Sequence, residues 1–144
     1  MKTLEYPLPA LTLSYDECNK LMKVVKKGLL AKARIRKPIP SNALYGPVSE
    51  GGLVLNHLYV TQGLMYLEKF VRFLGSDTVT GKLLTVTLEL SILEVGIGCN
   101  LFQLEYNKFR MLLSDSWLKS LWEFLSQYGI TIVDRIHSYP QIAR

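Results

Sequence analysis

The stretch 38-PIPSNALYGPVSEGGLVLNHLYVTQG-63 decides how this chain is organised. Its first part is rich in Pro and Gly, including the pair Gly51-Gly52, and residues of these types end helices and form tight turns. Its last part opens an amphipathic pattern in which apolar residues recur at helical spacing. We therefore expect a Gly/Pro-rich elbow over residues 38–56, which separates an N-terminal helix from the helices that follow.

A basic helix is predicted before the elbow, over about residues 14–34. Ser14 and Glu17 have the spacing of a capping box, and eight of the chain's 17 Lys and Arg residues lie between residues 20 and 37. At about 100° per residue the apolar side chains gather on one side of this helix. They are Cys18, Leu21, Met22, Val25 and Leu29. The cations Lys20, Lys23, Lys27 and Arg34 gather on the opposite side, within about 60°.

Three further amphipathic helices are predicted after the elbow, over about residues 57–74, 79–95 and 116–128. The segment 100–113 is expected to be an irregular connection with room for one helical turn. Residues 130–136 have the composition of a short strand, for which no partner strand is evident. Because amphipathic helices must bury their apolar stripes against one another, we expect a mostly α fold. Residues 1–144 should form a single helical domain, a small bundle of three to four helices.

Composition is that of an ordinary globular protein. The chain has 144 residues, of which 49% are hydrophobic and 20% charged, with a net charge of +5. The positive excess comes from the N-terminal quarter and favours a polyanionic partner. The two cysteines have no metal-type spacing, and Cys18 is expected to be a buried, reduced thiol.

Targeting and membrane signals are not apparent. The first ten residues carry two prolines and no long apolar run, so they do not resemble a secretory signal. The most apolar stretch, residues 83–97, is interrupted by Glu89 and Glu94 and is too short to span a bilayer. We expect an intracellular protein of the cytoplasm or nucleus, with no membrane partner.

Catalytic motifs are not recognised either. His57 and His137 lie far apart and belong to no metal-binding pattern, and nucleotide-binding loops and serine-nucleophile signatures are missing from the sequence. His57 is better interpreted as a residue at a helix start. We expect no metal, no cofactor and no autonomous catalysis.

Phosphate binding is the chemistry that the basic segment favours. Lys and Arg neutralise phosphates and release condensed counterions, and arginine pairs with phosphate through two donors. The candidates for phosphate contact are Lys20, Lys23, Lys27, Arg34, Arg36 and Lys37. The alternative is a solvated helix face that only keeps the protein soluble.

The elbow and the aromatic residues allow two interpretations each. Gly51 and Gly52 either let a nucleic-acid backbone approach closely or form a tight turn, and the tight turn is favoured. Tyr45 and Tyr59 flank the elbow and are candidates for exposed base stacking. The remaining aromatic residues at helical spacing, Tyr66, Phe70, Trp117, Trp122 and Phe124, are expected in the core.

Several short motifs occur in an order that resembles the region after the polymerase palm in LINE-like (non-LTR) reverse transcriptases. The first motifs are Pro38-Ile39-Pro40, Leu44-Tyr45-Gly46-Pro47, Gly51-Gly52-Leu53, Leu58-Tyr59 and Gln62-Gly63. They continue through Thr80-Gly81-Lys82-Leu83, Glu94 to Gly98 and Trp117 to Trp122. Val54 and Asn56 depart from the family's usual continuation of the elbow.

This resemblance implies a thumb-like, helical module that contacts the template–primer duplex. It further implies an RNA or DNA backbone as partner, beside a polymerase palm encoded elsewhere or lost. The Tyr-x-Asp-Asp motif of the catalytic palm is absent from the chain, so nucleotide transfer is not expected of it. A helical protein–protein interaction module without a nucleic-acid role is the alternative.

Overall fold

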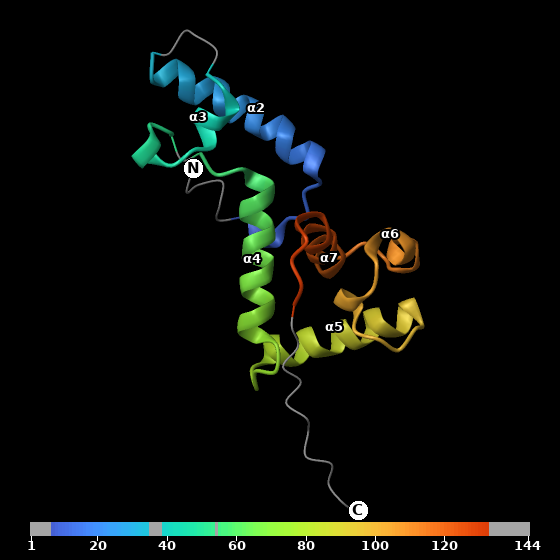
Figure 1. Cartoon of the computed structure of the whole chain (residues 1–144). Helices are drawn as coiled ribbons and strands as arrows, with labels where there is room; N and C mark the ends of the chain where they lie inside the picture. The colour runs from blue at the N-terminus through green and yellow to red at the C-terminus, as the bar shows by residue number, and fades with distance from the viewer. Residues whose placement is uncertain (1–6, 35–38, 54, 133–144) are drawn as a thin grey trace, which may run out of the picture.

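The computed structural model describes residues 7–34, 39–53 and 55–132, and these ranges are mostly helical, without a strand (Figure 1). The α-helices are α2 (Tyr15–Lys32), α3 (Ser41–Tyr45), α4 (Leu58–Phe73), α5 (Val79–Val95), α6 (Tyr106–Phe109) and α7 (Trp117–Tyr128). Four short 3-10 turns complete the secondary structure, η1 (Leu8–Ala10), η2 (Val48–Glu50), η3 (Leu101–Gln103) and η4 (Arg110–Leu112).

The mostly α fold predicted from the sequence is confirmed, and the four long helices begin and end close to their expected positions. The elbow contains two short elements, α3 and η2, that the sequence did not suggest. Residues 130–132 form no strand, and residues 133–136 of the expected strand lie outside the described residues.

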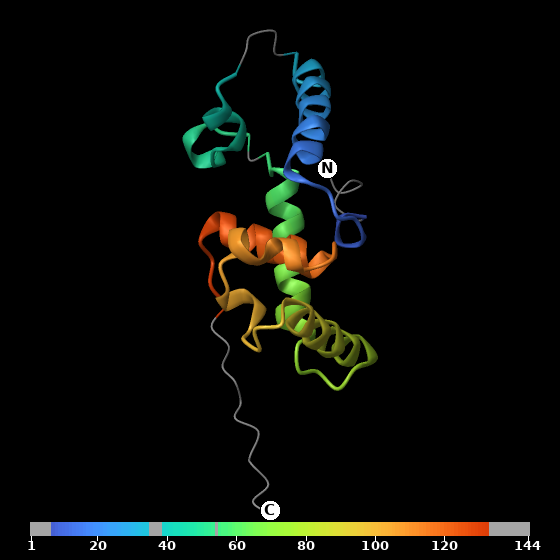
Figure 2. The same ribbon diagram turned by 90° about the vertical axis from the view of Figure 1, so that its right-hand side faces the viewer.

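Helix α4 is the axis of the fold. Figures 1 and 2 show α7 crossing the middle of α4, with α2 and α3 at one end of α4 and α5 at the other. The crossing of α4 and α7 is close because Gly63 of α4 lies directly against the ring of Phe124. Small residues at such crossings let two helix backbones approach each other.

Helices α2, α4, α5 and α7 share the main core. Its largest fully buried side chains include Tyr66, Phe70, Met22, Leu58, Leu118 and Leu121. A second, smaller cluster joins the end of α5 to the 101–113 region around Trp122. Four of the five aromatic residues expected in the core are buried, and Trp117 is partly buried.

Residues 11–13 lie in extended conformation against α4, and buried polar groups hold them there. Gln62 accepts a hydrogen bond from the Leu13 amide (3.2 Å) and donates one to the Leu13 carbonyl (3.0 Å). The hydroxyl of Tyr66 donates to the carbonyl of Leu11. These bonds satisfy polar groups that would otherwise be buried without partners.

Helix ends follow the sequence closely. Ser14 caps α2 in a complete capping box with Glu17, and left-handed glycines end α5 and α7 at Gly96 (φ 74°) and Gly129 (φ 63°). At the start of α4 the N-cap is His57, whose Nδ1 accepts from the Tyr59 amide at 3.2 Å. His57 is thus the helix-start residue that we expected.

Candidate nucleic-acid interface

Helix α2 has one buried side and one exposed side. Cys18 and Met22 are fully buried in the main core, and Val25 and Leu29 pack against it. The predicted free thiol at Cys18 is confirmed as buried, and this burial raises the pKa of the thiol. The opposite side of the helix faces solvent.

Three lysines form the exposed side of α2. Lys20, Lys23 and Lys27 are all exposed, and their spacing places them within one third of a turn of each other. Asp16 lies one turn before Lys20 on the same side, so the positive face begins at Lys20 and extends toward the end of the helix. We call Lys20, Lys23 and Lys27 the basic face.

In the described ranges, most Lys and Arg side chains beyond α2 form ion pairs, whereas those of α2 form none. Among the described residues, no Lys or Arg between positions 20 and 34 forms an ion pair. Four of the described cations beyond α2 do form ion pairs. These pairs are Arg72–Glu68, Lys82–Asp77, Lys108–Glu105 and Lys119–Asp115. The charge of the basic face is therefore available to an external anion.

Arg34 does not belong to the helix as expected. Helix α2 ends at Lys32, and Arg34 has a left-handed backbone with φ 54°. The helix ends because the Arg34 amide bonds the carbonyl of Ala31 (3.2 Å) in a tight last turn. Arg34 is exposed just beyond the basic face, while Arg36 and Lys37 lie outside the described residues.

The Gly-Gly pair of the elbow forms a tight turn. Gly51 takes a left-handed conformation (φ 80°) after η2, and the Gly52 amide bonds the carbonyl of Pro47 at 2.9 Å. A Cβ on Gly52 would overlap the backbone of Gly46. The close approach that Gly52 permits is therefore made by the chain's own Gly46.

Neither tyrosine beside the elbow is a free stacking platform. Tyr59, a candidate for exposed stacking, is only 5% exposed, because it packs edge-on against Tyr15 and Phe124. Tyr45 is half-buried, and the ammonium of Lys26 lies 4.8 Å from the centre of its ring. This cation–π contact connects α2 to α3.

His57 links α4 to α2. Its Nε2 lies 2.9 Å from the Oδ1 of Asn19, and its Nδ1 accepts from the helix backbone, so Nε2 carries the proton. Burial, and to a smaller extent the nearby charge of Lys26, lower the pKa of His57. Both ring nitrogens are engaged in structural bonds.

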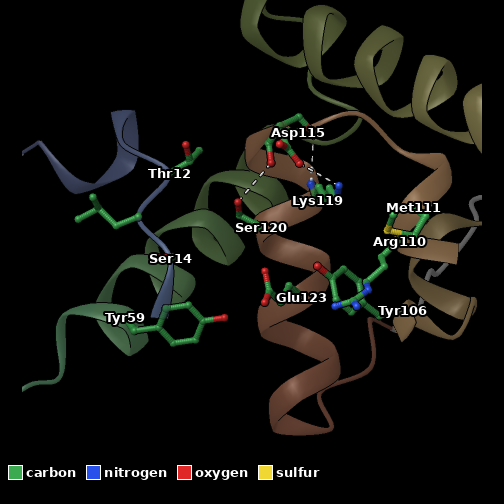
Figure 3. Close-up of a pocket in the computed structure, with 12 residues that line it drawn as sticks. Thr12, Ser14, Tyr59, Tyr106, Arg110, Met111, Asp115, Lys119, Ser120 and Glu123 are labelled. Atoms are coloured by element: carbon green, nitrogen blue, oxygen red, sulfur yellow. Dashed lines mark hydrogen bonds and ion pairs between the residues drawn. The ribbon is translucent and has the colours of Figure 1, made fainter. Parts of the chain in front are cut away.

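A polar pocket of about 540 Å³ lies between α7, the 106–111 region and residues 12–14 (Figure 3). No sequence pattern indicates this pocket, because its lining comes from segments far apart in the chain. Arg110, Lys119 and Glu123 supply charges, and none of the lining residues is a histidine or cysteine. The pocket thus offers no imidazole base and no thiol nucleophile.

Tyr59 contributes an unusual group to this pocket. Figure 3 shows its phenol pointing toward Glu123 of α7. The hydroxyl is buried and has no hydrogen-bond partner among the described residues. Burial raises the pKa of Tyr59 strongly, and the negative charge of Glu123 adds to the effect.

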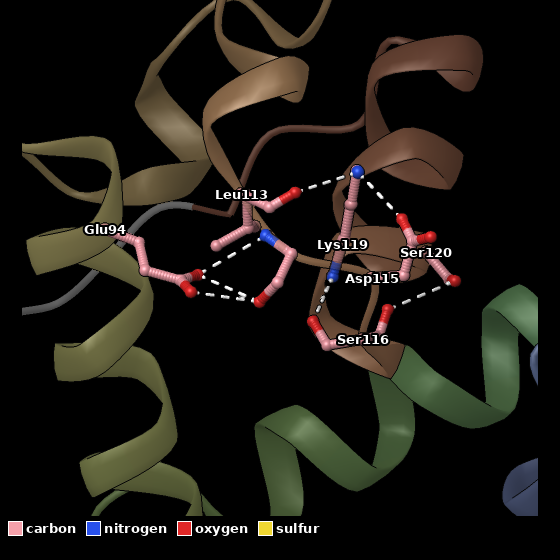
Figure 4. A network of polar contacts seen from close by, with 7 residues as sticks. Glu94, Leu113, Asp115, Ser116, Lys119 and Ser120 are labelled. Atoms are coloured by element: carbon pink, nitrogen blue, oxygen red, sulfur yellow. Dashed lines mark hydrogen bonds and ion pairs between the residues drawn. The ribbon is translucent and has the colours of Figure 1, made fainter.

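A network of polar contacts ties α5 to the start of α7 (Figure 4). Both carboxylate oxygens of Glu94 accept from the Ser114 hydroxyl, at 3.0 and 3.1 Å. Lys119 donates to the Leu113 carbonyl (2.9 Å) and to Asp115 (2.8 Å), which lowers the pKa of Asp115. Within this network, the bonds between Glu94 and Ser114 are the ones that connect α5 to the segment before α7.

Neither a metal-binding cluster nor a membrane-spanning helix is found in the described part of the chain. No group of three or more His, Cys, Asp or Glu side chains there could hold a metal ion. No helix within those ranges has the length and apolar character needed to cross a membrane.

Comparisons with known proteins give no relatives. No protein-family model matches the chain, and neither a curated protein nor a solved structure is significantly similar to it.

Proposed function

We propose that this protein is a non-catalytic module that binds the phosphate backbone of RNA or DNA through the basic face of α2. The observation that carries the proposal is the contrast in ion pairing. Lys20, Lys23 and Lys27 share an exposed side and form no ion pair with any described residue, whereas Arg72, Lys82, Lys108 and Lys119 are paired.

Geometry favours backbone contact over base recognition. Three lysines spaced along one side of a helix span about 10 Å, which matches a few successive phosphates. Tyr59 is buried and Tyr45 is partly covered, so neither flanking tyrosine offers a free ring to stack on bases. Binding should therefore be independent of base sequence.

The resemblance to the thumb of LINE-like reverse transcriptases is compatible with this chemistry. A thumb contacts the template–primer duplex from one side and leaves nucleotide transfer to the palm. We propose that the module supports a polymerase palm that is encoded elsewhere or has been lost.

A salt titration tests the proposal. Fluorescence anisotropy of a labelled duplex is measured at several salt concentrations. Three phosphate contacts predict a slope of log K against log salt of about −2.7, and a Lys23→Glu variant should reduce its steepness by about 1. Arg72→Glu makes the same change of net charge at an exposed, paired cation of α4 and is the matched control.

Two results would contradict the proposal. One is binding that does not respond to salt, and the other is equal loss of affinity in Lys23→Glu and Arg72→Glu. The second would show that net charge alone attracts the nucleic acid.

A further inference from the structure

Helix α5 has an apolar stripe on the side that faces away from the protein. The stripe consists of Val79, Leu83, Val86, Leu90 and Leu93, whose side chains are between 52% and 76% exposed. Their spacings of four, three, four and three residues are those of the a and d positions of a coiled coil. Ile97, just beyond the helix, is 43% exposed and extends the apolar surface.

The opposite side of α5 already packs in the fold. Leu84, Ser91 and Val95 are buried there, about half a turn away from the stripe. The bond between Glu94 and Ser114 fixes how the helix is rotated. The stripe is therefore a second apolar side on one helix, and an apolar side of an amphipathic helix is normally covered.

The exposed apolar area of the stripe is large enough for a role in an interface. Its five side chains present about 500 Å² of apolar surface, which is near the upper end for the largest patch on a typical monomer. A standard interface takes about 800 Å² from each partner. With its flanking residues the stripe comes close to that area.

We infer that α5 pairs with α5 of a second copy of this chain, in an antiparallel, two-fold symmetric dimer. A self-complementary patch is what a two-fold interface requires. The heptad spacing of the stripe supplies it, since the a and d side chains of one copy fit between those of the other.

Charges beside the stripe select the antiparallel orientation. Lys82 and Glu89 lie on one edge of the stripe and Glu94 on the other. Within the chain Lys82 also pairs with the exposed Asp77 (2.9 Å) and Glu94 bonds Ser114 (3.0 Å). An antiparallel two-fold pair brings like edges together, so that Lys82 of each copy lies beside Glu89 of the other. A parallel pair would instead bring Glu89 beside Glu94 twice, which is repulsive.

This surface is separate from the basic face. Figures 1 and 2 show α5 and α2 at opposite ends of α4. Self-association through α5 would thus leave Lys20, Lys23 and Lys27 accessible, and the two proposals can fail independently.

Light scattering and sedimentation equilibrium over a range of concentrations test the inference. Wild-type protein should reach twice the 16.4 kDa chain mass. Leu90→Glu should weaken dimerisation roughly 100-fold or more, because it buries two unpaired carboxylates in each dimer. Val48→Glu replaces an apolar residue that is more exposed still (73% against 57% for Leu90) near the other end of the molecule, and this variant should still dimerise.

Charge exchange tests the orientation. Lys82→Glu and Glu89→Lys should each weaken the antiparallel dimer, and the double variant should restore it. In a parallel dimer Glu89→Lys would strengthen association, because it removes the repulsion from Glu94. That result would overturn the antiparallel pairing.

Other outcomes would overturn the inference as a whole. One is a wild-type chain that stays monomeric at every concentration, and this includes a chain that binds lipid vesicles as a monomer. The other is a dimer whose dissociation constant is unchanged in Leu90→Glu. Circular dichroism of each variant shows whether it folds, which is expected since each change lies on an exposed side chain.

Discussion

Replacing Gly63 by alanine tests the crossing on which the fold depends. A Cβ at this position would lie within 3.0 Å of the ring of Phe124, which is closer than real Cβ atoms approach other atoms. Phe124 is 2% exposed and has ring contacts with Tyr59 and Tyr128, so it has little room to move. Either α7 must shift away from α4 or the ring must leave its position.

Two opposing effects determine how much Gly63→Ala changes the free energy of unfolding. Overpacking of a close-packed core costs about 1–3 kcal/mol, whereas replacing glycine by alanine inside a helix gains about 1 kcal/mol. Because the added Cβ would lie well inside the 3.0 Å limit from three ring atoms, the cost should fall in the upper part of that range, about 2–3 kcal/mol, and we expect Gly63→Ala to lower the free energy of unfolding by about 1–2 kcal/mol. The gain from helix propensity is too small to offset the steric conflict.

Gly28 provides a matched control within the same chain. It also lies inside a helix, but no heavy atom would lie within 4 Å of an added Cβ. Gly28→Ala should therefore stabilise the protein by about 0.5–1 kcal/mol. The same substitution is thus expected to destabilise the protein at position 63 and to stabilise it at position 28.

Urea denaturation followed by circular dichroism measures both variants. Adding Phe124→Leu to Gly63→Ala should recover part of the loss, because the smaller side chain relieves the contact. A Gly63→Ala variant as stable as wild type would refute the described crossing of α4 and α7.

Further predictions concern two tyrosines and one helix cap, and denaturation midpoints check all of them. Tyr59→Phe should change stability by less than about 0.5 kcal/mol or increase it, because the hydroxyl that it removes has no hydrogen-bond partner in the described ranges. Tyr66→Phe should cost about 1 kcal/mol, because the bond to the Leu11 carbonyl is lost, and equal effects of the two changes would contradict both assignments. Bonds from Ser14 lower the pKa of Glu17 below its usual value of 4.5, so the folded state favours the ionised carboxylate. That stabilisation is present above pH 4.5 and is lost as the pH falls through the lowered pKa. Glu17→Ala should therefore be less stable than wild type at neutral pH but not in acid, and a difference that persists unchanged in acid would count against the capping box.

The sequence was most informative where local chemistry determines structure. The capping box at Ser14 and the helix-ending glycines Gly96 and Gly129 are local patterns, and the structure has each of them. The apolar spacing located the long helices but not every buried residue, since Leu21 on the expected apolar side of α2 is 41% exposed. Even the β-branched residues of α5 are compatible with a helix. Thr85 and Thr87 donate their hydroxyl hydrogens to carbonyls four residues earlier, at 3.0 and 2.7 Å.

Features that depend on distant segments were not predictable. At about 100° per residue Gln62 falls on the polar side of α4, yet the residue is only 2% exposed because its amide bonds the backbone of Leu13. Tyr59 is buried for a similar reason, since Tyr15 and Phe124 cover it from other helices. Helical periodicity describes one helix, whereas these contacts arise from the whole tertiary arrangement.

Helix α5 shows the opposite discrepancy, in which apolar residues at helical spacing are exposed rather than buried. Its apolar residues occur on two opposite sides, with polar residues between them, so the sequence alone does not say which side is covered. The structure resolves this, because the Leu84 side is buried and the Leu83 side is exposed. An apolar side that the fold leaves uncovered is better explained by an external partner than by folding.

Helix α4 gives the two proposed surfaces their independence. Because it places α2 and α5 at opposite ends, a charge introduced at Lys23 lies far from the stripe, and one introduced at Leu90 lies far from the basic face. Electrostatic effects between exposed groups are largely screened beyond about 8–10 Å in ordinary buffers. Lys23→Glu should therefore weaken nucleic-acid binding without changing the mass of the particle, and Leu90→Glu should change that mass without altering the lysines that contact phosphate. If one variant abolished both properties, the explanation would have to be loss of the α4 framework, and circular dichroism would reveal it.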